Sequence, residues 1–204
     1  NAESCEGSVQ TGAGTGLRTL DSAANCVGAS ETGIGLKADG NATGSSGTTI
    51  SGSFGAQIAG AADNCRGVVR SGGGTALQAA TAANCHGKTD GTGRGLQAAT
   101  ALNCSAESTS NTALQVTINA ENCRGEASDS GYGLYCAGNA LNCYGSTAAG
   151  AYGIYVLGTA NTCRGKNDGA GPVEFSLHAA IAIGCTSEKG AIEAANRYLM
   201  PASP

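Results

Sequence analysis

The chain has 204 residues, a length that fits one domain, with 34 glycines, ten cysteines, 4% aromatic residues and no Trp. Its formal net charge is −4 and only 13% of its residues are charged, which excludes the basic surface of a nucleic-acid-binding protein. No apolar run reaches membrane-spanning length, so we expect no membrane span. A core of large aromatic side chains is excluded as well, and the interior must consist of small residues.

A four-residue phrase, Asn-Cys-x-Gly, recurs from one end of the chain to the other. Complete copies begin at Asn25, Asn64, Asn84, Asn122 and Asn142. Weaker copies surround Cys5, Cys104, Cys163 and Cys185. Successive cysteines of the phrase lie 19 to 22 residues apart, except for one gap of 39 residues. A fixed period near 20 predicts a solenoid, in which repeats stack because none buries its apolar face alone.

Short alternating runs within each period predict strands rather than helices. Leu134-Tyr135-Cys136 and Ile154-Tyr155-Val156 alternate with a period of two, and glycine clusters separate such runs. A period of 20 residues leaves no room for an ordinary helix together with a strand. The sequence therefore predicts an all-β protein of about ten coils, a parallel rod about 48 Å long from the spacing of stacked strands.

In chain order, residues 1–36 form the first coils and residues 37–64 look irregular. The phrase missing from the 39-residue gap is placed at 41–44, with Ala42 at the Cys position, and residues 44–49 are expected to form a loop or a shifted strand. Residues 65–165 are the regular centre. Residues 1–189 are assigned to the repeats. Residues 190–204, with Tyr198, Leu199 and Met200, are predicted to form a C-terminal cap.

Three kinds of residue are expected to form ladders along the rod. Cys is small, apolar and often buried, so the Cys row should face inward. A Leu/Ile row forms the second inward row, and the Asn before each Cys should occupy a left-handed bend and bond to the Asn of the next coil. The Gly two residues after Cys is expected to serve the following turn. The Cys ladder consists of Cys5, Cys26, Cys65, Cys85, Cys104, Cys123, Cys143, Cys163 and Cys185. The Asn ladder consists of Asn25, Asn64, Asn84, Asn103, Asn122 and Asn142.

The thiols of the Cys ladder are expected to be mostly reduced. In-register side chains hold Cβ atoms about 4.8 Å apart, farther than the 3.5–4.5 Å typical of a disulfide. A disulfide is left open where the stack is irregular. The ladder lacks a Cys-x-x-Cys pair and the chain has only two His, so neither a zinc site nor any other metal or cofactor is predicted.

The phrase Asn-Cys-x-Gly followed by Gly-x-Gly-Leu resembles the right-handed parallel β-helix superfamily, the pectate-lyase-like class. More narrowly, the chain resembles secreted bacterial proteins built of Cys/Asn-laddered coils, and the likeness covers residues 1–195. The resemblance implies a right-handed parallel β-helix. It leaves function open, because that superfamily includes lyases, hydrolases, tailspikes, adhesins and inert spacers.

A charged patch is the first candidate for chemistry. Residues at equal distances after successive Cys bring together His86, Lys88, Glu107, Arg124 and Glu126. Two carboxylates one coil apart would be separated by about 5 Å, as in retaining glycoside hydrolysis, and Lys or Arg beside them could act as the base of a uronate lyase. The competing interpretation is a salt-bridged outer ladder that pairs Lys88 with Glu107 and Arg124 with Glu126.

Tyrosines are the second candidate, because five of the six lie in two coils. They are Tyr132, Tyr135, Tyr144, Tyr152 and Tyr155. Tyr combines an apolar face with a polar tip, which suits a sugar or protein partner, although β-propensity alone could place it on an exposed sheet.

A flat stripe of small residues is the third candidate, since Thr81 and Thr100 pair as in ice-binding solenoids. The row is expected to break at Gly138 and Gly158. Side-to-side packing of solenoids is the alternative use of such a stripe.

The functional hypothesis from sequence is a secreted structural solenoid: a spacer, or a surface or filament subunit that self-associates head to tail or laterally. The alternatives are a polysaccharide-binding or polysaccharide-cleaving protein and an ice-binding solenoid. The chain carries no signal peptide and begins inside a coil at Asn1, so we expect a trimmed product or a fragment.

Overall fold

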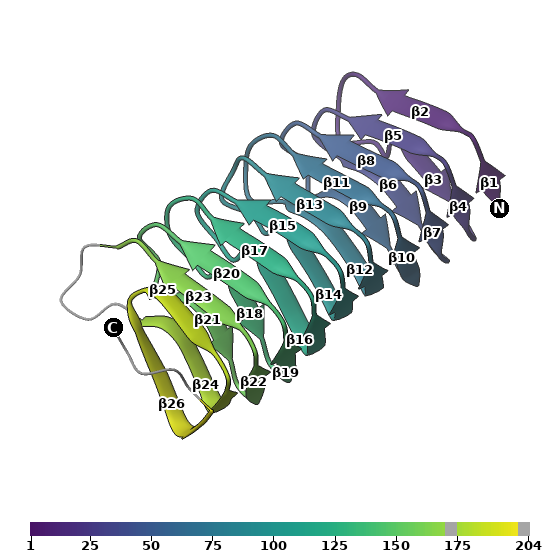
Figure 1. Ribbon diagram of the computed structural model, residues 1–204. Coiled ribbons are helices and arrows are strands. Elements are labelled where there is room, and N and C mark those ends of the chain that lie inside the picture. Colours follow the sequence, from purple (N-terminus) through teal and green to yellow (C-terminus); the bar gives the residue numbers. More distant parts are fainter. Residues whose placement is uncertain (170–174, 200–204) are drawn as a thin grey trace.

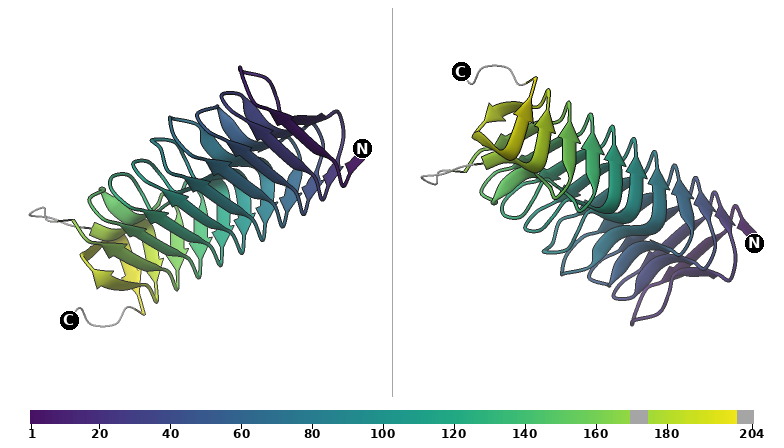
Figure 2. Two further views of the ribbon diagram at one scale, coloured as in Figure 1. Left: turned by 90° about the horizontal axis from the view of Figure 1, so that it is seen from above. Right: turned by 90° about the horizontal axis from the view of Figure 1, so that it is seen from below.

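The computed structural model describes residues 1–169 and 175–199 as a parallel β-solenoid of about nine turns (Figure 1). Every strand pairing among these residues is parallel, as the 20-residue period predicted. Ten strands stack in one sheet and are separated by nine steps, close to the ten coils expected. Two further views show the same rod from above and below (Figure 2). The right-handed sense stays a prediction, supported by the strong preference of parallel crossovers.

Two sheets form the walls of the rod. The strands of sheet 2 are β2 (Glu6–Val9), β5 (Val27–Ser30), β8 (Ser46–Thr49), β11 (Arg66–Val69), β13 (His86–Thr89), β15 (Ser105–Ser108), β17 (Arg124–Ala127), β20 (Tyr144–Thr147), β23 (Arg164–Asn167) and β25 (Thr186–Lys189). Each follows one position of the Cys ladder. The opposite wall is sheet 1, with one or two strands per coil. Among the described residues there is no helix with the length and apolarity needed to cross a bilayer.

Sheet 1 has one set of strands that carries the Leu/Ile row and a second set that continues around a bend. The strands of the Leu/Ile row are β3 (Leu17–Thr19), β6 (Ile34–Ala38), β9 (Phe54–Ile58), β12 (Thr75–Ala83), β14 (Leu96–Leu102), β16 (Leu114–Glu121), β18 (Leu134–Cys136), β21 (Tyr152–Val156), β24 (Phe175–Ile183) and β26 (Ala191–Tyr198). The strands of the second set are β1 (Ala2–Glu3), β4 (Ala23–Ala24), β7 (Ala42–Thr43), β10 (Ala61–Asp63), β19 (Asn139–Leu141) and β22 (Thr159–Asn161).

The core consists of stacked rows, and both predicted inward rows are confirmed. In the Leu/Ile row, Leu36, Leu114 and Ile154 are each 0% exposed. In the Cys row every thiol except the half-buried Cys5 is buried, and all ten cysteines of the chain are free thiols. Burial of one such Leu per coil contributes about 1.5–3 kcal/mol, which gives the narrow rod a continuous apolar interior.

The predicted Asn ladder is confirmed in the backbone of all six Asn and in the side chains of three of them, Asn84, Asn103 and Asn122. The six Asn have φ of 51° or 52°, the left-handed region that Asn tolerates better than other side chains. The Asn122 amide donates to Asn103 Oδ1 at 3.2 Å, and the Asn103 amide donates to Asn84 Oδ1 at 3.4 Å. Ser4, Thr162, Gly44 and Gly184 take the same conformation on the remaining coils. The row therefore fixes the same bend on each coil.

The expected irregularity at residues 37–64 is wrong. Ser46 pairs with both Val27 and Arg66, which places Ser45, not Ala42, in line with Cys26 and Cys65. Ser45 Oγ donates to the Thr43 carbonyl at 3.0 Å, as Cys26 Sγ does to the Ala24 carbonyl at 3.2 Å. Of the loop or shifted strand expected at 44–49, a strand is present: residues 46–49 form β8, in register with both neighbours. Gly44, and not Asn41, occupies the position of the Asn row on this coil.

The expected role of the Gly after Cys is also wrong, because this Gly lies in a strand and not in a turn. Gly67 is buried in β11, and a Cβ there would lie 1.9 Å from the carbonyl oxygen of Ala76 on sheet 1. Gly125 and Gly87 face the opposite wall in the same way, with carbonyl oxygens at 1.9 and 2.0 Å. The residue is small because the two walls nearly touch there.

A further inward row, not anticipated from sequence, is made of Ala. It runs on consecutive coils through Ala2, Ala23, Ala42, Ala62, Ala82, Ala101, Ala120, Ala140, Ala160 and Ala182. At the C-terminal end of the rod, Arg197 stands in register with Ala182. Its guanidinium donates to the carbonyl oxygen of Ile192 on the same strand. An inward-pointing charge of this kind blunts a sheet edge.

The segment predicted as a cap is described only in part. Ala191–Tyr198 form β26, which pairs with β24 and adds a further strand of the solenoid. Tyr198 and Leu199 are 54% and 86% exposed, and Met200 lies outside the described residues with the rest of the tail. The cap therefore stays a prediction.

Candidate functional site

One outward row of sheet 1 crosses every coil that the structure describes. Its members directly follow the Leu/Ile row and so point to the opposite face of the strand. This outer row consists of Arg18, Lys37, Gln57, Gln78, Gln97, Gln115, Tyr135, Tyr155, His178 and Glu193. It is cationic at the N-terminal end, amide-rich in the middle and aromatic towards the C-terminal end.

The C-terminal part of the outer row belongs to an aromatic cluster. Tyr135 and Tyr155 stack with ring centroids 5.7 Å apart and an interplanar angle of 4°. Tyr132 and Tyr152 stack beside them at 6.1 Å. The four tyrosines thus lie together on the outer side of sheet 1. Because stacked rings cover one another's faces, they present mainly edges and hydroxyl groups to solvent.

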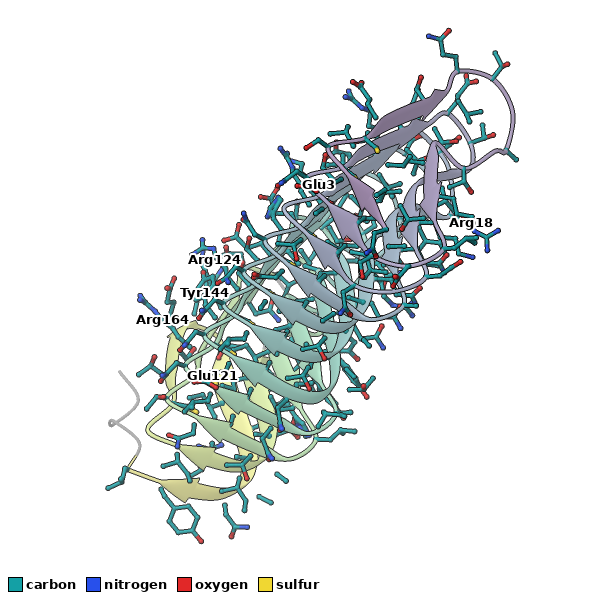
Figure 3. All side chains as sticks on the ribbon, turned by 90° about the vertical axis from the view of Figure 1, so that its right-hand side faces the viewer. Glu3, Arg18, Glu121, Arg124, Tyr144 and Arg164 are labelled. Carbon is teal, nitrogen blue, oxygen red and sulfur yellow. The ribbon has the colours of Figure 1, made fainter. Side chains whose placement is uncertain are left out.

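Two members of this cluster were missed by the sequence reasoning. Phe175 stacks on Tyr152 at 5.7 Å, and His178 stacks on Tyr155 at 4.5 Å. Both could have been found by counting from Leu177, which already belonged to the Leu/Ile row. Tyr144, in contrast, does not join the cluster: it lies on β20 of sheet 2, where the Arg124 guanidinium sits 4.7 Å from its ring centroid. Figure 3 shows Arg124, Tyr144 and Arg164 side by side along that face.

A carboxylate, that of Glu193, binds two side chains at the edge of the aromatic cluster. Glu193 Oε2 accepts from the Tyr152 hydroxyl at 3.0 Å and contacts His178 Nδ1 at 2.8 Å. The hydrogen bond with His178, and then that from Tyr152, lowers the pKa of Glu193. Burial, followed by the bond to Glu193, raises the pKa of Tyr152 to about 12, so its hydroxyl stays protonated at neutral pH. These contacts orient His178 and Tyr152 towards Glu193.

The charged patch predicted for sheet 2 is assembled by the strand register. Lys88 pairs with Glu107, and Glu107 with Glu126, on β13, β15 and β17. Lys88 Nζ lies 3.0 Å from Glu107 Oε2, and Arg124 forms an ion pair with Glu126. The salt-bridged outer ladder is therefore confirmed.

The protonation states in this patch do not favour a lyase. The bond to Glu107 raises the pKa of Lys88, so the amine is protonated at neutral pH and cannot act as a base. Burial lowers the pKa of His86, whose Nδ1 lies 2.8 Å from Ser105 Oγ. Each of the two glutamates already has a cation as its ion-pair partner, so neither carboxylate is left free for a separate catalytic role.

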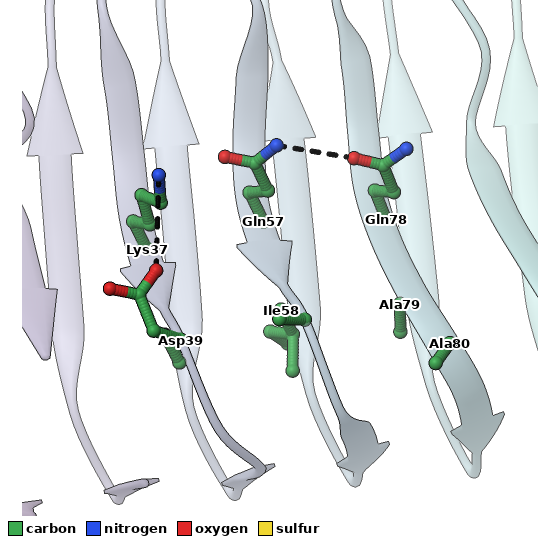
Figure 4. Close-up of a pocket in the computed structure, with 9 residues that line it drawn as sticks. Lys37, Asp39, Gln57, Ile58, Gln78, Ala79 and Ala80 are labelled. Carbon is green, nitrogen blue, oxygen red and sulfur yellow. Dashed lines mark hydrogen bonds and ion pairs between the residues drawn. The ribbon is translucent and has the colours of Figure 1, made fainter. Parts of the chain in front are cut away.

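The surface beside the outer row has a shallow polar depression of about 340 Å³ (Figure 4). Gln57 Nε2 donates to Gln78 Oε1 at 3.3 Å along one side of it. Lys37 Nζ lies 3.8 Å from Asp39 Oδ1 at one end. The described residues contain no group of three or more His, Cys, Asp or Glu placed to hold a metal ion. The depression offers hydrogen-bonding groups but no reactive constellation.

The predicted Thr row exists only over two coils. Thr81 pairs with Thr100 as expected, but the row continues through Asn119, Asn139 and Thr159 and not through Gly138 and Gly158. The register shifts after Ala98, because β16 holds an extra residue at its bend. The mixed row lacks the regular threonine pattern on which the ice-binding hypothesis depended.

Comparisons with protein-family models, with curated proteins and with solved structures found no match for this chain.

Proposed function

We propose that this chain is a secreted structural solenoid that acts as a stiff spacer in an extracellular or surface assembly. The observation that carries the proposal is the use of outward side chains to connect one coil to the next. Lys88 bonds to Glu107 and Tyr135 stacks on Tyr155, each across neighbouring coils. Arg164 Nε likewise lies 2.7 Å from Glu188 Oε1. Residues that could have formed a reactive site thus brace the rod.

Head-to-tail assembly, the extension of this role expected from sequence, meets an obstacle at the C-terminal end. An added coil would have to bury Arg197 in the Ala row, and a buried guanidinium without a charged partner costs several kcal/mol. We therefore propose that the rod acts as an isolated spacer, and that end-to-end growth requires displacement of Arg197.

A structural role predicts no glycan turnover. The native protein is expected to release neither reducing ends nor unsaturated uronates from a panel of polysaccharides, because both candidate carboxylates are ion-paired. Glu107→Ala and Glu126→Ala, tested beside it, should give the same blank result. Turnover by the native protein that is lost in either variant would overturn the structural assignment in favour of the enzyme.

Polysaccharide binding is the second candidate, favoured by the continuity of the outer row. One hydrogen-bonding or aromatic side chain per coil, at about 4.8 Å intervals, offers a regular series of contacts to a linear polymer. Tyr hydroxyl groups and Gln amides supply donors and acceptors for sugar hydroxyls. Binding of this kind needs no reactive group, and it is compatible with tyrosine rings that present their edges and hydroxyl groups, not their faces, to solvent.

Retention on insoluble polysaccharides tests the second candidate. If the outer row binds glycan, a double variant, Tyr135→Ala with Tyr155→Ala, should weaken retention about tenfold, because each aromatic contact contributes about 0.5–1.5 kcal/mol. Tyr144→Ala is the matched control, since Tyr144 lies on the other sheet. Equal retention of all three proteins, or no retention of the native one, would remove this candidate and leave the spacer.

A further inference from the structure

The Cys ladder contains an unbroken run of seven thiols on consecutive coils. They are Cys65, Cys85, Cys104, Cys123, Cys143, Cys163 and Cys185, and each is at most 2% exposed. Ser45 separates this run from a pair at the N-terminal end, Cys26 and the half-buried Cys5. The proposed structural role needs small apolar groups here, which Ala would supply as it does in the Ala row. Packing alone therefore does not account for thiols at these positions.

The sulfur atoms are held in line by the backbone. Each thiol donates to the carbonyl two residues before it, as in Cys85 to Ala83 at 3.1 Å and Cys123 to Glu121 at 3.1 Å. Neighbouring rungs are in contact, since the Cys65 backbone nitrogen lies 3.4 Å from Cys85 Sγ. With the same rotamer on each coil, successive sulfurs repeat at the strand spacing of about 4.8 Å.

This spacing suits a metal ion bound midway between two sulfurs. An ion on the line joining them would lie about 2.4 Å from each, close to the 2.3 Å of a zinc–thiolate bond. Such a site is linear, and it offers two ligands instead of the four of a tetrahedral zinc centre. Soft ions that accept two thiolates are the matching class.

Charge selects the ion within that class. Two thiolates and a divalent ion are neutral together, whereas a monovalent ion leaves one negative charge in an apolar core, where an uncompensated charge is costly. We propose that neighbouring thiols of the Cys ladder form linear two-coordinate sites for a soft divalent cation, with Hg(II) as the ion that fits. In the reaction two S–H bonds break, two Hg–S bonds form, two protons leave to solvent and no oxidation state changes.

The ends of the ladder give the ion its entry points. Cys5 is half-buried at the N-terminal end. At the other end, the run of seven thiols stops at Cys185, on the last coil of the ladder. Ion uptake should therefore begin at the termini, where coils also fray most readily.

A parity rule makes the proposal testable. Each sulfur joins one neutral site, so seven consecutive thiols hold at most three ions, and Cys5 with Cys26 holds a fourth. Cys123→Ser divides the run into three and three thiols and should remove one ion. Cys104→Ser divides it into two and four and should remove none. Ser45 shows that a hydroxyl fits this row, so both variants should fold.

The folded protein is incubated with Hg(II) and excess glutathione. Native mass spectrometry then gives the number of ions bound per chain. The expected result is four ions in the native protein, four in Cys104→Ser and three in Cys123→Ser, with unchanged circular dichroism. X-ray absorption should show two sulfur neighbours per mercury, and Zn(II) should not be retained. Equal losses in the two variants, more than two sulfurs per ion, unfolding on addition of Hg(II), or no bound ion would each overturn the proposal.

Discussion

Gly67→Ala is expected to destabilise the protein by about 3 kcal/mol, at the upper end of the cost of overpacking a core. The added Cβ would meet three atoms of sheet 1: the carbonyl oxygen and carbon of Ala76 at 1.9 and 2.4 Å, and Leu77 Cβ at 2.8 Å. Two of these are backbone atoms of β12, so the clash cannot be relieved by a change of side-chain rotamer. The measurement is the urea midpoint followed by circular dichroism.

Gly73→Ala is the matched control. A Cβ at Gly73 would have only Thr92 Oγ1 nearby, at an ordinary 3.7 Å, and the residue has no positive φ. Its midpoint should stay within about 0.5 kcal/mol of the native protein, as for most surface changes. If the two variants had the same midpoint, the walls would be able to separate at Gly67. Ala106, the natural occupant of this row on β15, marks where they already accommodate a methyl group.

Arg197→Ala is expected to convert an isolated rod into a self-associating one. The substitution restores the Ala row at its last position and removes the guanidinium from the Ile192 carbonyl. Among the described residues nothing pairs with the outer edge of β26, and without the guanidinium the apolar cross-section beside that edge becomes a template for another coil. Sedimentation velocity at increasing protein concentration should show a rising weight-average coefficient for the variant and a constant one for the native protein.

Arg164→Ala controls for the loss of one positive charge. Arg164 lies on the outer face of sheet 2, on the strand before the last, where it is paired with Glu188 and stands outside the Ala row. It should sediment like the native protein. Self-association of both variants would point to net charge and lateral contact, and self-association of neither would show that Arg197 does not guard the end.

These expectations separate the structural role from the thiol chemistry. Arg197 acts at the end of the rod and leaves all ten cysteines in place. Sedimentation reports whether the rods associate, and mass spectrometry reports whether the thiols bind an ion, so either property can be found without the other. Likewise the glycan tests address the outer row of sheet 1 and the patch on sheet 2, neither of which includes a ladder thiol.

Contacts along the axis could be predicted from the sequence by counting. With a 20-residue period, the neighbour of any residue is the one at the same place in the next repeat. Stacking of Tyr135 on Tyr155, the pairing of Lys88 with Glu107 and the bonds between Asn103 and Asn122 all follow from that rule. The rule failed where its anchor was misplaced, at Ala42, and where β16 gained a residue at its bend.

By itself, then, the sequence determined the repeat, the parallel stacking and the inward Cys and Leu/Ile rows, because periodic sequence positions become axial neighbours. Contacts across the rod were decided only by the tertiary structure, since they depend on the angles of the bends. Those angles press Gly67 against Ala76, and Gly125 against Gly133, from one wall to the other. They also place Tyr144 on a different face from the other tyrosines of its coils. No period in the sequence encodes these distances.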